Sequence, residues 1–358
     1  MIKYLGSKRL LVDVIADVAE AVGTTTALDL FTGTTRVAQE LKRRGLFVTA
    51  ADVASYSEVF AQCYVGTDAA DMDAGDLELA VKELNTLPGN PGYVTETFCR
   101  QSRYFQPHNG ARIDAIREAI EREHAVGPLR PILLTALLDA ADRVDSTTGL
   151  QMAYLKSWAP RSYDDLELRV PQLLAGPGRA IRGDAHDVAT GHEPVDFAYL
   201  DPPYNQHRYF TNYHVWETLV RWDAPEHYGI ACKRADARHD DTKSVFNRKR
   251  EMPAAMERLI AQTRADVVVV SYNDESWVTP AEMTGWLHAA GHEDVAVLAF
   301  DTKRYVGAQI GIHNPAGERV GTPGRLRNQE LLFVAGPREK VRAATAVHEG
   351  RSTRSAQR

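Results

Sequence analysis

The residues of this chain best suited to chemistry lie in the segment VDFAYLDPPYNQHRYF, which spans 195–210. Its apolar first half is typical of a buried strand, and it ends on Asp201, Pro202, Pro203 and Tyr204. A proline fixes φ and has no backbone N–H, so neither proline can donate a ladder hydrogen bond. The turn therefore offers rigidly placed acceptors beside an aromatic ring, which suits a planar group that carries an NH₂.

Three more aspartates lie in or just after strand-like segments. They are Asp29 in TALDLF (26–31), Asp52 in LFVTAAD (46–52) and Asp184 in RAIRGDA (179–185). In an open α/β sheet, ligands bind at the carboxyl ends of the strands, so we expect these carboxylates to line the same crevice as Asp201. Asp52 could instead be a helix cap or a turn residue.

A glycine-bearing turn connects the first of these strands with a helix, in LDLFTGTTRVAQEL (28–41). Gly33 would let a ligand approach the backbone closely, and Thr34 or Thr35 can cap the helix. One glycine does not make a GxGxxG fingerprint, so both a cofactor site and a plain strand–helix turn stay open. Asp52 stands about 20 residues further on, where an acidic residue is expected to bind ribose hydroxyls.

Seven apolar segments predict the strands of a sheet. They are 26–31, 46–52, 179–185, 195–201, 265–273, 294–301 and 330–336. Helical periodicity lies between most of them, as in 35–45 and 280–291, and both of these helices end in glycine. Continuous apolar runs are typical of buried parallel strands. Strands that alternate with helices predict an α/β fold with a mostly parallel sheet.

The alternation is interrupted between Thr67 and Gly178, where the patterns are helical, most clearly in 109–123 and 129–145. We therefore predict a helical insertion, residues 67–178, in a domain formed by residues 1–66 and 179–336. The basic end, residues 337–358, is polar and aperiodic, and we predict that it is disordered.

Composition sets limits on the class of protein. The chain has 358 residues, of which 44% are hydrophobic and 25% charged, as in an ordinary globular protein. No apolar run approaches a membrane span and the first residues lack a signal peptide, so we expect a cytoplasmic protein. Its three cysteines are scattered, which indicates a reduced compartment and no cysteine-based metal site. The net charge of −6 argues mildly against a nucleic-acid partner, although basic residues cluster at 248–250, 303–304 and 317–327.

Four motifs together resemble those of DNA amino-methyltransferases, which transfer a methyl group from S-adenosylmethionine to the exocyclic amine of adenine or, less often, cytosine. DPPY (201–204) resembles their catalytic motif, and YLGSKR (4–9) the N-terminal motif of the Dam-like adenine subgroup. DLFTGTTRVA (29–38) is similar to its cofactor motif and SYN (271–273) to a later strand-end motif, and the order of the motifs is that of the subgroup. Thr35 departs from the pattern, because many relatives carry a further glycine there.

The resemblance implies a Rossmann-like, S-adenosylmethionine-dependent methyltransferase sheet, mostly parallel with an antiparallel strand. It also implies that residues 67–178 recognise the target in double-stranded DNA. The Asp201 carboxylate and the Pro202 carbonyl would accept the two N–H bonds of the amine, Pro203 would stiffen the turn, and Tyr204 would stack on a flipped-out base. The implied cofactor contacts are Tyr4, Gly6, Lys8, Asp29, Phe31, Gly33, Thr34, Asp52, Asp184, Ala185 and Asp201. No metal is implied.

Two sets of polar residues are candidates for contacts with DNA. CRQSRYFQPHNGAR (99–112) supplies possible base readers in Arg100, Gln101, Arg103, Asn109 and Arg112. We predict a DNA-facing loop at Arg208 and Tyr209, phosphate contacts at Lys243 and Arg248, and core packing for Val215, Trp216 and Leu219. A solvated surface is the alternative for each polar group.

Competing functions differ at the catalytic motif. Cytosine N4 methyltransferases more often carry serine in place of Asp201, and protein-glutamine methyltransferases usually carry asparagine there. A DNA-binding module without enzymatic activity would need no intact DPPY turn. The resemblance leaves open whether a restriction endonuclease is the partner.

Overall fold

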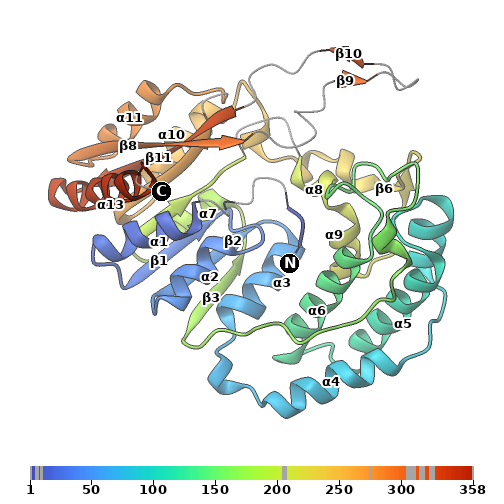
Figure 1. Ribbon diagram of the computed structural model, residues 1–358. Helices are drawn as coiled ribbons and strands as arrows, with labels where there is room; N and C mark the ends of the chain where they lie inside the picture. The colour runs from blue at the N-terminus through green and yellow to red at the C-terminus, as the bar shows by residue number, and fades with distance from the viewer. Residues whose placement is uncertain are drawn as a thin grey trace. The chain divides into compact units, whose positions relative to one another are not determined.

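Helices and strands alternate along the chain, as a computed structural model shows (Figure 1). The structure describes residues 2–4, 8, 11–203, 208–273, 276–303, 312–313, 319–321 and 327–356. The chain divides into two units. Unit 1 comprises Met1–Ala16, Thr25–Val188 and His207–Ser244, and unit 2 comprises Asp17–Thr24, Ala189–Gln206 and Val245–Arg358.

Unit 1 contains three parallel strands, with β2 (Phe47–Asp52) between β1 (Thr26–Leu30) and β3 (Gly178–Arg182). Helix α2 (Arg36–Arg43) connects β1 with β2, and α3 (Ser55–Ala61) follows β2. The apolar residues in the interior of β1 and β2 are buried, as predicted. The prediction of a buried third strand is wrong, because Arg179 and Arg182 of β3 are exposed. Residues three apart on a strand point to opposite faces, so these two arginines place a charged side chain on each face of β3.

The rest of unit 1 is largely helical (Figure 1). The described residues between Thr67 and Gly178 form helices and no strand, as predicted. These helices are η2 (Ala69–Asp71), α4 (Ala74–Thr86), η3 (Thr95–Gln101), α5 (Pro107–Glu123), α6 (Leu129–Arg143) and η4 (Pro160–Tyr163). They share one apolar core with α3, since Ile116 and Leu137 cluster with Phe60. The insertion therefore belongs to the same compact unit as β1, β2 and β3.

Short elements complete unit 1. They are η1 (Gln62–Gly66), α8 (Tyr209–Asn212), α9 (His214–Arg221), β5 (His227–Tyr228), β6 (Lys233–Arg234), η5 (Ala235–Arg238) and η6 (Asp240–Thr242). Strands β5 and β6 pair as an antiparallel hairpin. Helices α1 (Val12–Ala21) and α7 (Ala185–Gly191) precede β1 and follow β3. Val215, Trp216 and Leu219 of α9 are buried, which confirms their predicted place in the core.

Four strands of unit 2 lie side by side in the order β4 (Val195–Leu200), β7 (Ala265–Asn273), β11 (Arg327–Gly336) and β8 (Asp294–Lys303). β4 and β7 are parallel, and β11 is antiparallel to both of its neighbours. Strands β1, β2 and β3 are parallel to one another, as are β4 and β7, which confirms the predicted α/β class with an antiparallel strand. The remaining elements of unit 2 are η7 (Val245–Asn247), α10 (Met252–Gln262), α11 (Pro280–Ala289), β9 (Ile312–His313) and β10 (Arg319–Gly321).

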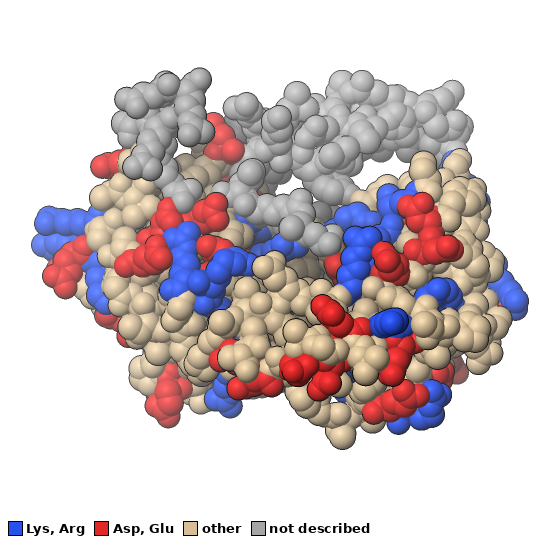
Figure 2. Space-filling model, turned by 60° about the horizontal axis from the view of Figure 1, so that its bottom comes forward, with Lys and Arg blue, Asp and Glu red and all other residues tan. Residues whose placement is uncertain are grey.

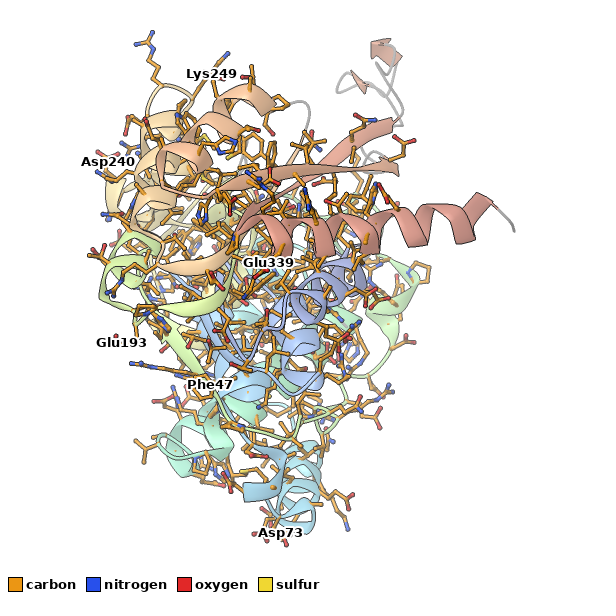
Figure 3. The ribbon with its side chains drawn as sticks, turned by 90° about the vertical axis from the view of Figure 1, so that its left-hand side faces the viewer. Phe47, Asp73, Glu193, Asp240, Lys249 and Glu339 are labelled. Atoms are coloured by element: carbon orange, nitrogen blue, oxygen red, sulfur yellow. The ribbon has the colours of Figure 1, made fainter. Side chains whose placement is uncertain are left out.

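The basic end of the chain is helical. Helix α13 (Arg338–Ala356) contains Glu339, labelled in Figure 3, and packs against β8 and β11. The prediction of a disordered end is therefore wrong. Val341 and Ala344 lie three residues apart and are buried, and these two apolar positions anchor one face of an otherwise polar helix. No helix in the described part of the chain is long and apolar enough to cross a membrane.

Candidate functional site

The turn after β1 has an unusual backbone. Phe31, Gly33 and Thr35 have φ values of 67°, 53° and 60°, so three residues in five adopt the left-handed conformation. This conformation costs a residue other than glycine on the order of 1–3 kcal/mol and persists only where the surroundings enforce it. Strained backbone of this kind concentrates at ligand sites, and here it follows the predicted cofactor strand.

Hydrogen bonds hold this turn to the strands. The N–H of Thr32 donates to the carbonyl of Ala51 in β2 at 3.0 Å. Its hydroxyl donates to the buried carboxylate of Asp29 at 2.7 Å. Asp29 therefore fixes the turn from within β1, and its predicted contact with the cofactor stays a prediction.

Helix α2 begins without a side-chain cap. Thr35 stands at the N-cap position, but its hydroxyl donates to the carbonyl of Thr34 at 2.7 Å and accepts from Gln39 Nε2 at 2.8 Å. The prediction that a threonine side chain caps this helix is wrong, because the left-handed Thr35 does not turn its oxygen toward the free N–H groups of α2.

Asp52 ends β2, and two backbone N–H groups orient its carboxylate. Its Oδ2 accepts the N–H of Gly33 at 2.9 Å, and its Oδ1 accepts the N–H of Ala54 at 3.0 Å. Burial raises the pKa of Asp52, and these backbone N–H groups partly oppose that rise. Each carboxylate oxygen has a second lone pair, and the side chain is half-buried. Asp52 can therefore still accept hydroxyl groups of a ligand.

Val53, which follows Asp52, was not predicted as a site residue. It exposes 61% of its surface although it is apolar and directly follows a buried strand. An exposed apolar side chain beside an oriented carboxylate suits the face of a ring. The sequence gives no sign of this exposure, because valine at a strand end is usually packed.

Tyr4 closes over the glycine of the cofactor turn. A Cβ atom on Gly33 would lie 3.1 Å from Cε1 of Tyr4, so only glycine leaves room for this ring. The ring stacks on Tyr213 with centroids 4.6 Å apart, and its hydroxyl lies 3.4 Å from that of Tyr56. Burial raises the pKa of Tyr4 well above its ordinary value. The structure thus brings together Tyr4, Gly33 and Asp52, which the sequence places far apart.

More aromatic rings extend this contact. Tyr213 stacks on Trp216 with centroids 4.9 Å apart, and Tyr56 meets both rings edge-on. Tyr209, predicted in a DNA-facing loop, instead begins α8 and stacks on Tyr4 at 5.4 Å. Arg208 precedes that helix and is exposed. Tyr56 and Tyr213 were not predicted as site residues, because Tyr213 contacts Tyr4 and Tyr56 across more than a hundred residues of sequence.

The other predicted cofactor residues have visible backbone roles. Asp184 is exposed, and its Oδ1 accepts the N–H of His186 at 2.9 Å, so it caps α7. Ala185 begins that helix and is buried. The carbonyl of Lys8 accepts the N–H of Leu11 at 2.7 Å, where α1 starts. Gly6 lies outside the described residues. Ligand contacts of these residues stay predictions.

The DPPY motif follows β4 in unit 2. Leu200, the last residue of β4, pairs with Val270 of β7. Asp201 follows Leu200 and therefore lies near the carboxyl end of β7. Pro202 is buried, and Asp201 and Pro203 are half-buried. Tyr204 lies outside the described residues.

The SYN motif at the end of β7 is buried. Asn273 Nδ2 donates to Glu330 of β11 at 3.2 Å, and the Tyr272 hydroxyl lies 3.6 Å from Met252 Sδ. Burial raises the pKa of Tyr272 to about 12. These contacts fix the end of β7, which neighbours the DPPY turn.

Comparison with known proteins decides between the candidate families. The model of the D12 class N6 adenine-specific DNA methyltransferase family matches residues 4–285. The chain belongs to this family. The methyltransferase acts on DNA, and its cofactor is S-adenosylmethionine.

Curated relatives of this methyltransferase are themselves methylases. It is 28% identical to Type II methyltransferase M.NlaIII of Neisseria lactamica, over 75% of this chain and 80% of the relative. It is 28% identical to Type II methyltransferase M.CviAII of Paramecium bursaria Chlorella virus 1, over 83% and 90%. Modification methylase StsI of Streptococcus sanguinis is 29% identical over 80% of this chain, which spans only 46% of that protein.

Three predicted base readers of the methyltransferase, of which Arg100 and Gln101 are exposed and Arg103 is half-buried, already have partners within the protein. Arg100 pairs with Glu96 at 3.2 Å, and Gln101 binds Glu96 through its nitrogen and His227 of β5 through its oxygen at 2.8 Å. Arg103 donates to the carbonyl of Lys156 at 2.8 Å and lies over the ring of Trp158. Solvent-exposed bonds of this kind contribute little stability, so these side chains can be redirected.

Two other residues of that segment have structural roles. Asn109 is buried, donates to the carbonyls of Ser162 and Asp164 and accepts the N–H of Leu166 at 2.8 Å. Arg112 donates to the carbonyl of Asn85 at 3.0 Å. The suggestion that Asn109 reads bases is wrong, because the segment after α6 folds back onto α5 and covers it.

The candidate phosphate contacts also lie in ion pairs. Lys243 contacts Asp240 at 2.7 Å, and Arg248 contacts Glu251 at 3.0 Å. Figure 2 shows acidic and basic side chains intermixed over the face that it presents. Among the described residues, no group of three or more His, Cys, Asp or Glu side chains is placed to hold a metal ion.

Proposed function

We propose that this methyltransferase transfers a methyl group to the N6 amine of an adenine flipped out of double-stranded DNA. One observation carries the proposal: an intact DPPY turn directly follows β4, beside the end of β7, in a chain of the N6 adenine-specific family. A binding module without catalysis has no use for a turn of rigid acceptors.

The chemistry requires acceptors, because the lone pair of the adenine amine is delocalised into the ring. The Asp201 carboxylate and the Pro202 carbonyl accept the two N–H bonds of the amine and localise that lone pair. They also stabilise the positive charge that develops on the nitrogen, which is a preorganised electrostatic effect. Pro202 and Pro203 fix the backbone and thus the direction of both acceptors.

Base flipping is the step that Tyr204 supports. Extrusion of a base from the duplex costs a few kcal/mol. Stacking of the extruded base on an aromatic ring returns about 1–3 kcal/mol. In this proposal Tyr204 provides that ring next to the acceptors of Asp201 and Pro202.

The residues around the β1 turn fit the cofactor. S-adenosylmethionine supplies an electrophilic methyl group on a sulfonium. We assign its methionine end to Tyr4, Gly6, Lys8, Phe31, Gly33 and Thr34, its ribose to Asp52, and its adenine ring to Asp184 and Ala185. The orientation of the Asp52 carboxylate by two backbone N–H groups supports the ribose assignment, because acceptor geometry exists before any ligand binds.

The choice of target belongs to the helical insertion in this proposal. Residues 1–66 and 179–336 would perform the same transfer on any adenine, so discrimination requires the added surface of residues 67–178. Arg100 and Gln101 are exposed there, Arg103 is half-buried, and all three carry donors that match base edges in the major groove. Arg208, Lys243 and Arg248 are proposed to contact DNA outside the insertion.

The setting of the reaction is also proposed. Relatives named Type II methyltransferases support a role in restriction-modification, with a cognate restriction endonuclease as the partner. The three buried free cysteines are compatible with the cytoplasm.

Sequencing of DNA from cells that express the protein tests this function. We expect N6-methyladenine in one short sequence context, absent from cells with an empty vector. Methylation of cytosine N4 in such a context would replace the proposed substrate, and unmodified DNA from cells that contain folded protein would contradict the proposal.

A further inference from the structure

A buried carboxylate outside the predicted site supports the cofactor strand. Glu217 lies in α9, and only 1% of its surface is exposed. Its Oε2 accepts the N–H of Ser55, the first residue of α3, at 3.1 Å. The N-cap residue of α3 is Ala54, which has no side chain that can accept a hydrogen bond. Glu217 therefore supplies, from 162 residues further along the chain, the cap that the local sequence lacks.

The environment of Glu217 makes this arrangement costly. Burial raises the pKa of Glu217, and Arg221 approaches its Oε1 only at 3.8 Å from a partly exposed position. A neutral serine or asparagine at position 54 would cap α3 without a buried charge. The carboxylate instead connects α9 with the start of α3, which a local cap would not do.

The start of α3 is also the segment that orients Asp52. Asp52 Oδ1 accepts the N–H of Ala54, and Glu217 accepts the N–H of the next residue, Ser55. The carbonyl of Val53 accepts from Arg182 Nε at 3.3 Å. A shift of the Ser55 N–H would thus move the Ala54 N–H, which aims one oxygen of the Asp52 carboxylate.

Helix α9 is itself well fixed. Its first N–H groups donate to Gln151 Oε1, with Val215 N at 3.0 Å. Trp216 and the adjacent Tyr213 pack on Tyr56, which follows Ser55. A carboxylate on such a helix can hold the backbone that follows β2 in a fixed position.

We propose that Glu217 is a positioning residue of the cofactor site, which sets the direction of the Asp52 carboxylate through the N–H groups of Ala54 and Ser55. The inference rests on the proposed role of Asp52 as the ribose acceptor. It adds that the affinity for the ribose depends on a helix that follows the DPPY loop in the chain.

Calorimetry with S-adenosylhomocysteine tests the proposal in a double-mutant cycle of Asp52→Asn and Glu217→Gln. Glu217→Gln keeps an acceptor for Ser55 but removes the charge, so the fold is retained. Residues of one hydrogen-bond network couple, and we expect Glu217→Gln to weaken binding roughly threefold to tenfold in the wild-type background and hardly at all beside Asp52→Asn.

Asp114→Asn is the matched control. Asp114 is buried, and both of its oxygens accept backbone N–H groups, those of Val94 and Thr95 among them, at 2.8 Å. We expect this variant to lower the melting temperature without a change in S-adenosylhomocysteine affinity.

The possible results separate the two proposals. Unchanged affinity of Asp52→Asn alone would overturn the ribose role. If Asp52→Asn loses affinity but Glu217→Gln has no effect on affinity, the role of Glu217 is overturned and that of Asp52 stays intact. The same holds if Glu217→Gln weakens binding equally in the wild-type and the Asp52→Asn backgrounds. An equal loss of affinity in Asp114→Asn would show a general effect of stability and would also overturn it.

Discussion

Replacement of Asp52 by asparagine is the most informative test of the cofactor site. Both carboxylate oxygens accept a backbone N–H, from Gly33 at 2.9 Å and from Ala54 at 3.0 Å. Asparagine has one oxygen and one NH₂, so one of these N–H groups would face a donor. The variant also lacks one of the two oxygens proposed to receive the ribose hydroxyls.

The magnitude follows from the bonds that are lost. A hydrogen bond to a charged group contributes about 1.5–3 kcal/mol. Since each 1.4 kcal/mol is a factor of ten, loss of one such bond weakens S-adenosylhomocysteine binding roughly 10- to 150-fold. Titration calorimetry of wild type and Asp52→Asn measures this difference, with Asp114→Asn as the control for loss of a buried carboxylate. Equal affinities of wild type and Asp52→Asn would refute the ribose role.

The dependence on pH gives the same prediction a second measurement. Burial raises the pKa of Asp52 above its ordinary value, and only the ionised form offers all its lone pairs to hydroxyl donors. Affinity for S-adenosylhomocysteine should therefore be complete above that raised pKa and fall as the pH decreases through it. Asp52→Asn should flatten this part of the profile. A wild-type profile that is already flat across the acidic range would contradict the assignment.

Three further outcomes are expected. Gly33→Ala, which forces a Cβ to 3.1 Å from Tyr4 at a φ of 53°, should weaken S-adenosylhomocysteine binding in calorimetry, and unchanged affinity would remove the turn from the site. Arg103→Ala should relax the choice of methylated sequence at one base position, which sequencing of the methylated sites measures. Lys243→Ala should instead weaken binding to DNA of every sequence and flatten the salt dependence of the DNA affinity, which salt titrations measure. Asn109→Ala should lower the free energy of unfolding in urea by about 1–3 kcal/mol without a change in sequence choice, because it leaves buried partners unpaired.

The sheet could be predicted from the sequence because most of its strands are recognisable from local runs of apolar residues. The run 265–273 contains four consecutive valines (267–270) and coincides with β7, and the helical patterns between strands place α2 and α11 correctly. The errors lie where burial depends on a partner. β3 is short and only partly covered, and α13 is a largely polar helix whose buried residues include Val341 and Ala344 and whose Lys340 pairs with Asp266 of β7.

The candidate site was predictable in part for the same reason. Gly33 and Asp52 belong to a local strand–turn pattern, and the structure connects them through one hydrogen bond. Tyr56 and Glu217 reach the same strand end through pairings that span more than a hundred residues, and no local pattern encodes them. Asn109 has the amide side chain that suits a base reader, but it is buried by a segment that follows it by about 50 residues, and no local pattern predicts that burial.

Mass spectrometry of nucleosides tests the central claim most directly. DNA incubated with S-adenosylmethionine and either wild-type protein or Asp201→Ala is digested and its methylated nucleosides are measured, while calorimetry follows S-adenosylhomocysteine binding by the same two proteins. We predict N6-methyldeoxyadenosine with the wild type and none with Asp201→Ala, whose affinity for S-adenosylhomocysteine stays largely intact. Undiminished N6-methyldeoxyadenosine from the Asp201→Ala protein would contradict the account.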